Sequence, residues 1–195
     1  MADSPLTRAS LLVRIRDARD GAAWSQFVAL YAPLIYGHAR KHGLQDADAA
    51  DLTQDVLRAV AGAINRLDYD PSRGSFRGWL FTIVRNKLRN HLQTKGRQTP
   101  GSGATSAIRL LEQQAAPEED QWEADYQRQL FSWAVERIRS EFQEKTWQAF
   151  WRTAVEGKSG KDVAAKLQMT VAAVYLAKGR VLARLKEEIE QVRDD

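Results

Sequence analysis

Apolar side chains recur along this chain at steps of three and four positions. In the first half the runs are Leu11, Leu12 and Ile15, followed by Trp24, Phe27, Val28, Tyr31, Leu34 and Ile35. In the second half they are Tyr126, Leu130, Trp133 and Ile138, followed by Trp147, Phe150, Trp151 and Ala154. Since an α-helix turns once in about 3.6 residues, this spacing predicts amphipathic helices. The alternation typical of strands is nearly absent, so the pattern predicts an all-α chain with two small helical domains.

The stretch from residue 73 to residue 97 combines this spacing with basic residues. On a helical wheel one arc is apolar and holds Phe76, Trp79, Leu80, Ile83, Val84 and Leu88. The opposite arc is polar and holds Thr82, Arg85, Asn86, Arg89 and Gln93. One face is therefore expected to pack and the other to be available for binding.

Charge strengthens that interpretation without deciding it. No acidic residue occurs between Asp70 and Glu112, and residues 73–97 carry seven Lys and Arg side chains. A stripe of like charges repels itself unless a polyanion such as a phosphate backbone neutralises it. A solvated basic face on an ordinary core helix explains the charge equally well.

The sequence TKGRQTPGSGATS and the acidic stretch PEEDQWEAD separate the two helical halves. Pro and Gly break helices, and Ser and Thr favour turns. We therefore predict a domain at residues 1–95, a flexible acidic linker at 96–124 and a second domain at 125–195.

The second domain contains a pattern typical of a helix-turn-helix. Gly157 is placed to end one helix, Ser159 can cap a short helix, and Thr170 can cap a long helix after a turn at Gln168 and Met169. The long helix is expected to bury Val171, Val174, Val181, Leu182 and Leu185. It is expected to expose Tyr175, Lys178, Arg180 and Arg184.

Residues 159–186 hold six basic residues and one acidic residue. The long helix thus has the cap and the charge of a helix that enters the major groove of DNA. An antiparallel helical hairpin used for protein contacts is the alternative.

The segment LQDADAADLTQDVLRAVAGAINRLD predicts an acidic helix. Its apolar positions, four residues apart, are Leu52, Val56, Val60 and Ile64, and its carboxylates are Asp46, Asp48, Asp51 and Asp55. With His38 and His42 these carboxylates could in principle bind a metal, as in a metal-dependent nuclease. The basic helix offers no nucleophile or base, which disfavours that hypothesis. Helix-dipole complementation and a solvated or protein-contacting face are the simpler interpretations.

Composition narrows the class of protein. The 195 residues are 44% hydrophobic and 28% charged, as in globular proteins, and include no Cys. No window approaches a membrane-spanning length, and the N-terminal residues do not form a signal peptide pattern. We therefore expect a cytoplasmic protein without membrane insertion, disulfides or a Cys-based metal site.

The order of these motifs is specific. DLTQDVLRAV precedes GSFRGWLFTIVRNKLRNHL, and a distant helix-turn-helix ends in VYLAKGRVLARL. This arrangement resembles the extracytoplasmic-function (ECF) subfamily of bacterial sigma-70 RNA polymerase sigma factors, over about residues 10–95 and 125–190.

The resemblance implies roles for residues of the first domain. The DLTQDV-like helix binds the β′ clamp coiled coil of core RNA polymerase in the family, which here implicates Asp51, Gln54, Asp55 and Arg58. The following helix recognises and opens the minus-ten promoter element, with Asn86 helping to hold an unstacked base. Its implied DNA-binding residues are Arg77, Trp79, Arg85, Asn86, Lys87 and Arg89.

In the second domain the resemblance implies recognition of the minus-thirty-five element by Thr170, Tyr175, Lys178, Arg180 and Arg184. Two features depart from the family. Lys158, Ser159, Gly160 and Lys161 stand where the family often has a hydrophobic residue and acidic positions, and Tyr175 with Ala177 makes the reading helix less basic. These departures bear on the promoter sequence rather than on the fold.

The resemblance predicts a non-enzymatic transcription initiation factor that needs no cofactor or metal. Its implied partners are core RNA polymerase, promoter DNA, and an anti-sigma factor or other regulator. The alternative is a sigma-like decoy that binds an anti-sigma factor without initiating transcription.

Overall fold

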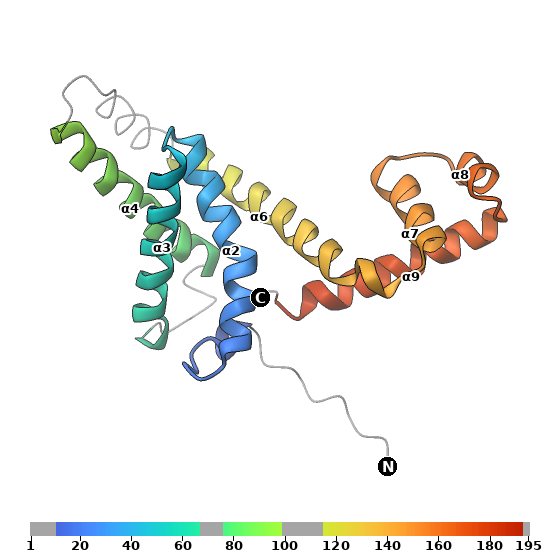
Figure 1. Cartoon of the computed structure of the whole chain (residues 1–195), viewed down its shortest axis with the longest axis horizontal. Helices are drawn as coiled ribbons and strands as arrows, with labels where there is room; N and C mark the ends of the chain where they lie inside the picture. Colours follow the sequence, from blue (N-terminus) through green and yellow to red (C-terminus); the bar gives the residue numbers. More distant parts are fainter. Residues whose placement is uncertain (1–10, 67–75, 99–114, 193–195) are drawn as a thin grey trace, which may run out of the picture. The chain divides into compact units, whose positions relative to one another are not determined.

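The computed structural model describes residues 11–66, 76–98 and 115–192, and within these ranges every regular element is a helix (Figure 1). The all-α prediction is confirmed. The described residues divide into two compact units, one that ends at Gln129 and one that begins at Leu130. We call them unit 1 and unit 2.

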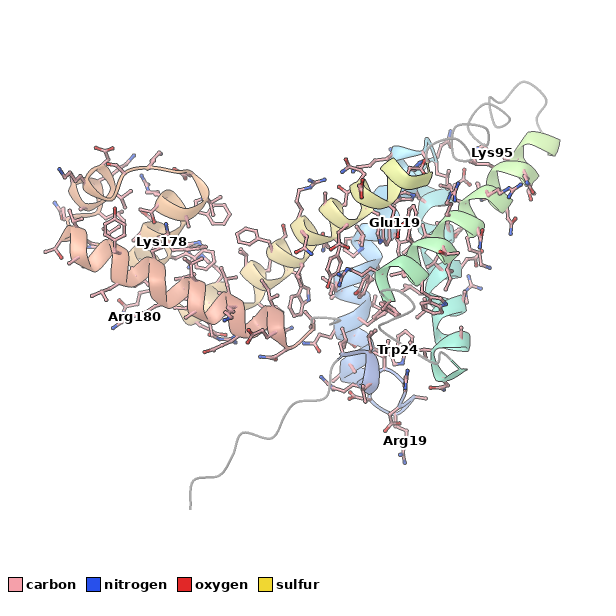
Figure 2. All side chains as sticks on the ribbon, turned by 180° about the vertical axis from the view of Figure 1, so that it is seen from behind. Arg19, Trp24, Lys95, Glu119, Lys178 and Arg180 are labelled. Atoms are coloured by element: carbon pink, nitrogen blue, oxygen red, sulfur yellow. The ribbon has the colours of Figure 1, made fainter. Side chains whose placement is uncertain are left out.

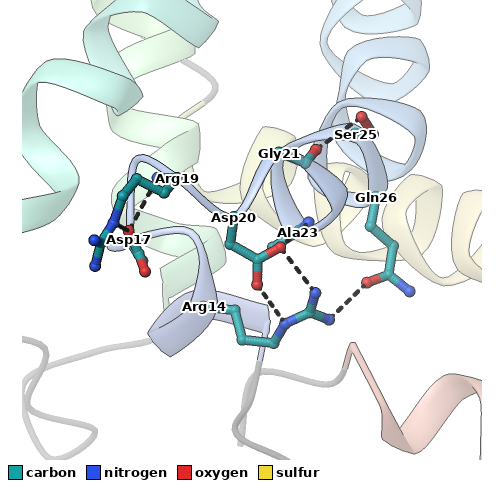
Figure 3. Close-up of polar contacts among 8 residues, drawn as sticks. All are labelled: Arg14, Asp17, Arg19, Asp20, Gly21, Ala23, Ser25 and Gln26. Atoms are coloured by element: carbon teal, nitrogen blue, oxygen red, sulfur yellow. Dashed lines mark hydrogen bonds and ion pairs between the residues drawn. The ribbon is translucent and has the colours of Figure 1, made fainter.

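Unit 1 begins with α1 (Leu11–Arg14) and α2 (Gly21–Lys41). Asp20 caps α2, since its carboxylate accepts a hydrogen bond from the Ala23 amide at 2.9 Å. Arg14 Nε donates to the same carboxylate at 2.9 Å, and Arg14 also reaches Gln26 (Figure 3). The Arg14 guanidinium and then the Ala23 amide hold the pKa of Asp20 below its ordinary value. A charged cap thus fixes α1 to the start of α2.

The core of unit 1 is built on aromatic rings. Helix α3 (Asp46–Ala63), extended by η1 (Ile64–Arg66), contacts both α2 and α4 (Phe76–Gln98). Phe27 of α2 lies 4.6 Å from the Tyr31 ring and 6.0 Å from the Phe76 ring, centroid to centroid. All three side chains are completely buried. Burial of such large rings is a main contribution to stability in a unit of this size.

Helix α6 (Ala115–Ile138) corrects the predicted linker. Trp122, only 1% exposed, packs its ring 5.4 Å from His38 and 5.6 Å from Phe81. Four residues later, Tyr126 stacks on Tyr31 at 5.7 Å. The prediction of a flexible linker at 96–124 is therefore wrong at both ends, because 96–98 continue α4 and 115–124 begin α6. The remaining positions, 99–114, lie outside the described residues.

The predicted start of the second domain at residue 125 is also corrected, to residue 130. Asp125 and Tyr126 belong to unit 1, and unit 2 begins at Leu130 within α6. The physical reason is the four-residue step from Trp122 to Tyr126, which places both rings on one helix face. We call residues 115–129 the docked segment.

Unit 2 continues with η3 (Arg139–Glu141), α7 (Glu144–Phe150) and the π-helical turn η4 (Trp151–Val155). Gly157 then adopts a left-handed φ of 68°, as its predicted helix-ending role requires. Ser159 caps α8 (Gly160–Leu167), and Thr170 caps α9 (Val171–Glu190) through the Ala173 amide at 3.1 Å.

The buried stripe of α9 is narrower than predicted. Its buried members are Val174, Ala177, Val181, Leu185 and Glu188, at steps of three and four. Val171 and Leu182 were expected inside, but they are 38% and 43% exposed. These two positions fall beside the stripe, and only one side of α9 packs against α7 and α8.

Candidate nucleic-acid interface

Helix α4 is buried on two sides. The predicted apolar face is confirmed for Phe76, Leu80, Val84 and Leu88, which are fully buried. Phe81 is 5% exposed on a second side, where it meets Trp122 of the docked segment. The surface left for binding is therefore narrower than the wheel predicts.

Of the residues predicted to contact the minus-ten element, Asn86 and Arg89 are the exposed ones. They lie three positions apart, so they share one face of α4 with the exposed Thr82. Arg85, Lys87 and Trp79 are half-buried, and the Trp79 ring lies 5.3 Å from the Phe76 ring. The structure thus brings an amide and a guanidinium together on one accessible face.

Arg77 lies apart from that face. Its Nε is 2.8 Å from a carboxylate oxygen of Glu123, and its guanidinium stands 4.8 Å from the centroid of the Tyr126 ring. Burial disfavours the charge, but Glu123 outweighs burial, so the pKa of Arg77 lies above its ordinary value. Arg77 already has an anionic partner within unit 1.

Further carboxylates of the docked segment face basic side chains of unit 1. Glu118 lies 3.2 Å from His42 Nε2 and 4.0 Å from Arg85 Nε, and Asp125 lies 2.5 Å from Lys41 Nζ. A phosphate and a carboxylate compete for the same donors. The docked segment therefore places negative charge where the sequence alone predicts an uncompensated basic surface.

His38 is a buried polar residue close to these ion pairs. Its side chain is buried against Phe81, Trp122 and His42. Burial, and then the neighbouring His42, lower the pKa of His38 to about 3. The imidazole is therefore neutral at physiological pH.

The carboxylates of α3 divide into two groups. Asp48 bonds Lys95 Nζ at 3.0 Å and lies 3.7 Å from His91, so it joins α3 to α4. Lys95 is the main cause that lowers the pKa of Asp48. The residues predicted to bind the polymerase clamp are all exposed on α3, and they are Asp51, Gln54, Asp55 and Arg58. Within residues 11–66, 76–98 and 115–192 no group of three or more acidic, His or Cys side chains is arranged to hold a metal ion.

On α9 the predicted DNA-contacting residues differ in their surroundings. Tyr175 is 56% exposed, Arg180 is exposed and Lys178 is half-buried. Figure 2 shows Arg180 on the side of α9 that faces away from α8. No ion pair of Lys178 or Arg180 is found within the described part of the chain.

Arg184, by contrast, is held by two carboxylates. Its Nε and Nη2 donate to Glu141 at 2.8 and 2.9 Å, and Nη2 lies 3.0 Å from Glu188. Arg137 also reaches Glu188, at 2.5 Å. Arg184 thus joins α9 to η3, and Thr170 has its hydroxyl engaged in the cap of α9.

A pocket of about 610 Å³ opens in unit 2 between α6, α7 and η4. Trp147 and Trp151 line it together with acidic and basic side chains. None of the predicted site residues lies there. Among the described helices, none is long and apolar enough to cross a membrane.

Sequence reasoning missed Glu118, Glu123 and Asp125 as partners of basic residues. Their signal was present, because they flank Trp122 and Tyr126 within one helical period. An acidic segment with two large aromatic residues four positions apart indicates an amphipathic helix rather than a linker.

Comparison with known proteins gives consistent matches. The family model "Sigma-70 region 2" matches residues 27–98. The ECF RNA polymerase sigma factor RpoE of Cereibacter sphaeroides is 37% identical over 78 residues, which span 40% of this chain and only 42% of RpoE. The RNA polymerase sigma factor CnrH of Cupriavidus metallidurans is 30% identical over 164 residues, 84% of each chain. The solved structure of CnrH in complex with the cytosolic domain of CnrY has a TM-score of 0.36 and 23% identity, and the alignment covers 92% of this chain and 95% of that chain.

Proposed function

Because the chain belongs to the ECF subfamily of sigma-70 RNA polymerase sigma factors, we propose that its two helical units divide promoter recognition between them. Sigma factors are transcription initiation factors that join core RNA polymerase and direct it to promoter DNA. In this proposal unit 1 binds the polymerase clamp and opens the minus-ten element. Unit 2 recognises the minus-thirty-five element.

The observation that carries the proposal is the exposed face of α4, within the segment matched as sigma-70 region 2. Asn86 offers an amide that can bond the edge of an unstacked base, and Arg89 lies one turn away for stacking or phosphate contact. Holding a base outside the duplex stabilises the open strands over the paired ones. Opening of this kind is driven by differential binding and needs no ATP.

The other predicted residues are assigned by exposure and charge. Asp51, Gln54, Asp55 and Arg58 form the exposed polar face of α3, which suits a polar contact with the clamp. On α9, Tyr175 and Arg180 are exposed and Lys178 is half-buried, so their side chains are accessible for contact with DNA. Arg77, Arg85 and Arg184 would have to exchange carboxylate partners for phosphates before they could contact DNA.

The same proposal places the protein in the cytoplasm with RNA polymerase. It assigns no chemical step to the residues of the chain, since binding energy alone accounts for recognition and opening. A regulator such as an anti-sigma factor would act by covering one of these faces.

The test is reconstitution with core RNA polymerase and promoter DNA taken from upstream of the chain's own gene. The expected result is permanganate-reactive thymines at the minus-ten element. Asn86→Ala should reduce this reactivity while affinity for core polymerase is unchanged. Asn65→Ala, an exposed amide in η1 and away from α4, is the matched control and should retain opening. Absence of opening with active core polymerase would refute the initiation function, and equal loss of opening and core binding would show that Asn86 is structural.

A further inference from the structure

The two departures from the family pattern, at residues 158–161 and at Tyr175, meet in the structure. Gly160 is the first residue of α8, directly after the cap Ser159. A Cβ built on Gly160 would lie 2.8 Å from Cζ, 2.9 Å from Cε2 and 2.9 Å from Oη of Tyr175. The distal end of the tyrosine ring therefore occupies the space that any other residue would need for its side chain.

The glycine is required for space and not for backbone conformation. The φ of Gly160 lies outside the left-handed region that favours glycine, unlike the φ of Gly157. Any residue could adopt the backbone of position 160, and alanine would favour the helix. Gly160 is buried although Ser159 and Lys161 beside it are exposed, in keeping with a ring that covers it.

The contact fixes how Tyr175 is presented. Its hydroxyl end rests against the start of α8, while 56% of the residue stays exposed. A side chain held between two helices loses little rotamer freedom when it binds, so its contact can be selective. With the hydroxyl turned toward α8, the ring itself is the part offered outward. In the major groove an apolar ring can contact the C5-methyl group of thymine.

We propose that Gly160 is a positioning residue that sets the orientation of the Tyr175 ring and thereby a thymine preference within the minus-thirty-five element. This inference rests on the proposed role of α9 in promoter recognition. Gly160 contacts no DNA itself and acts only through Tyr175.

Gly160→Ala is the direct test, because the ring can turn away from a new methyl group without disturbing the helices. Holoenzyme carrying this variant is selected against a promoter library randomised at the minus-thirty-five element. We expect the thymine preference at one position to fall about fivefold or more. Selection against a minus-ten library and affinity for core polymerase should stay unchanged, and the melting temperature should not fall.

Gly21→Ala is the matched control, since Gly21 is also the first residue of a helix after its cap, and a Cβ placed on it would have no atom within 4 Å. It should retain the wild-type preference. Tyr175→Ala should lose the preference as Gly160→Ala does, and the double variant should be no worse than Tyr175→Ala, as expected for residues that act as a unit.

A chemical test addresses the methyl group. Replacing the preferred thymine with deoxyuridine should weaken binding of wild-type holoenzyme and leave Tyr175→Ala unaffected. A wild-type preference in Gly160→Ala, or additive losses in the double variant, would overturn the positioning role. Absence of any minus-thirty-five preference in the wild-type holoenzyme would instead refute the proposed function of α9.

Discussion

The two helices proposed to read DNA, α4 and α9, are presented in opposite ways. Helix α4 is packed on two sides, and carboxylates of the docked segment face Arg77 and Arg85. Helix α9 is packed along one stripe, and Lys178 and Arg180 make no ion pair within the described residues. The more basic sequence segment thus has the more compensated surface.

This difference shows that the charge of a segment does not measure the potential at its surface. Seven basic residues in 73–97 were compatible with a phosphate-binding stripe and equally with a solvated basic face. In the folded unit, part of that charge is offset by acidic residues more than 30 positions away in sequence, such as Glu123 against Arg77. What remains outward on α4 is suited to holding a base, with Asn86 at its centre. On α9, Arg184 and Lys186 pair with carboxylates, whereas Lys178 and Arg180 have no ion pair among the described residues.

The largest expected effect comes from removing the anchor of the docked segment. Trp122→Ala should lower the stability of unit 1 by about 3–5 kcal/mol, because it leaves a cavity beside His38 and Phe81. Hydrogen exchange of α2 and α4 amides would measure the loss in unit 1, with α9 amides as the internal reference. Trp122→Phe should cost less, since the indole Nε1 has no hydrogen-bond partner among the described residues. Unchanged protection in Trp122→Ala would mean that the segment does not stabilise unit 1.

The next largest effect is expected at acidic pH, where unit 1 should lose stability before unit 2. The unfolded chain protonates His38 as the pH falls below about 6.5, whereas the folded pKa is about 3. The unfolded state therefore binds more protons in this window, and the stability of unit 1 should fall by up to about 1.4 kcal/mol per pH unit. Urea unfolding followed by circular dichroism between pH 6.5 and about 4.5 would measure it. His38→Leu should abolish most of this slope, and a slope equal to that of the wild type would contradict the assignment.

Unit 2 should resist the same change until lower pH. Burial opposes ionisation of Glu188, but Arg137 and Arg184 donate to it, and its folded pKa lies below the ordinary value of 4.5. The stability it contributes is present at neutral pH and is lost only as the pH falls through that lowered pKa. If unit 2 unfolded at a higher pH than unit 1, the expected order of acid sensitivity would be wrong.

The two arginines of α9 are expected to have different roles, Arg184 in the stability of unit 2 and Arg180 in DNA binding. Arg184→Ala should destabilise unit 2 by about 1–2 kcal/mol, because the buried Glu188 loses one of its two cationic partners. Arg180→Ala should leave stability within about 0.5 kcal/mol. It should weaken binding to minus-thirty-five DNA by about 1–3 kcal/mol. Thermal unfolding and DNA titration of both variants provide the check, and exchanged phenotypes would show that Arg184 is the reader.

The smallest effect is expected from removing the negative charge that faces a basic residue of α4. Glu123→Gln removes the charge facing Arg77, and should raise the affinity of the full chain for DNA only a few-fold. The dependence of log affinity on log salt should steepen by about 0.9 if one more phosphate contact forms. Glu119→Gln, an exposed acid on the same helix, is the control for net charge alone. Equal slopes in the two variants would show that the pair with Glu123 does not restrain Arg77.

Much of the fold could be predicted from local pattern. The caps Ser159 and Thr170, the left-handed Gly157 and the buried faces of α3 and α4 follow from residue type and spacing within one or two turns. The linker prediction was wrong at Trp122. The Gly, Pro and acidic residues of this region indicated a linker, but Trp122 and Tyr126, four residues apart, form the buried face of a helix. Val171 and Leu182 were wrongly predicted to be buried. The periodicity shows which side of a helix faces the core, but it does not show how much of that side the neighbouring helices cover.

The sequence by itself determined that the chain is helical and where α8 and α9 begin, and its motif order indicated the ECF sigma family. Those properties depend on neighbours a few positions apart. The tertiary structure decided which cations are compensated, that residues 115–129 belong to unit 1, and that Gly160 makes room for Tyr175. These depend on distances between residues far apart in the chain, which only packing brings within reach of Coulomb and van der Waals forces.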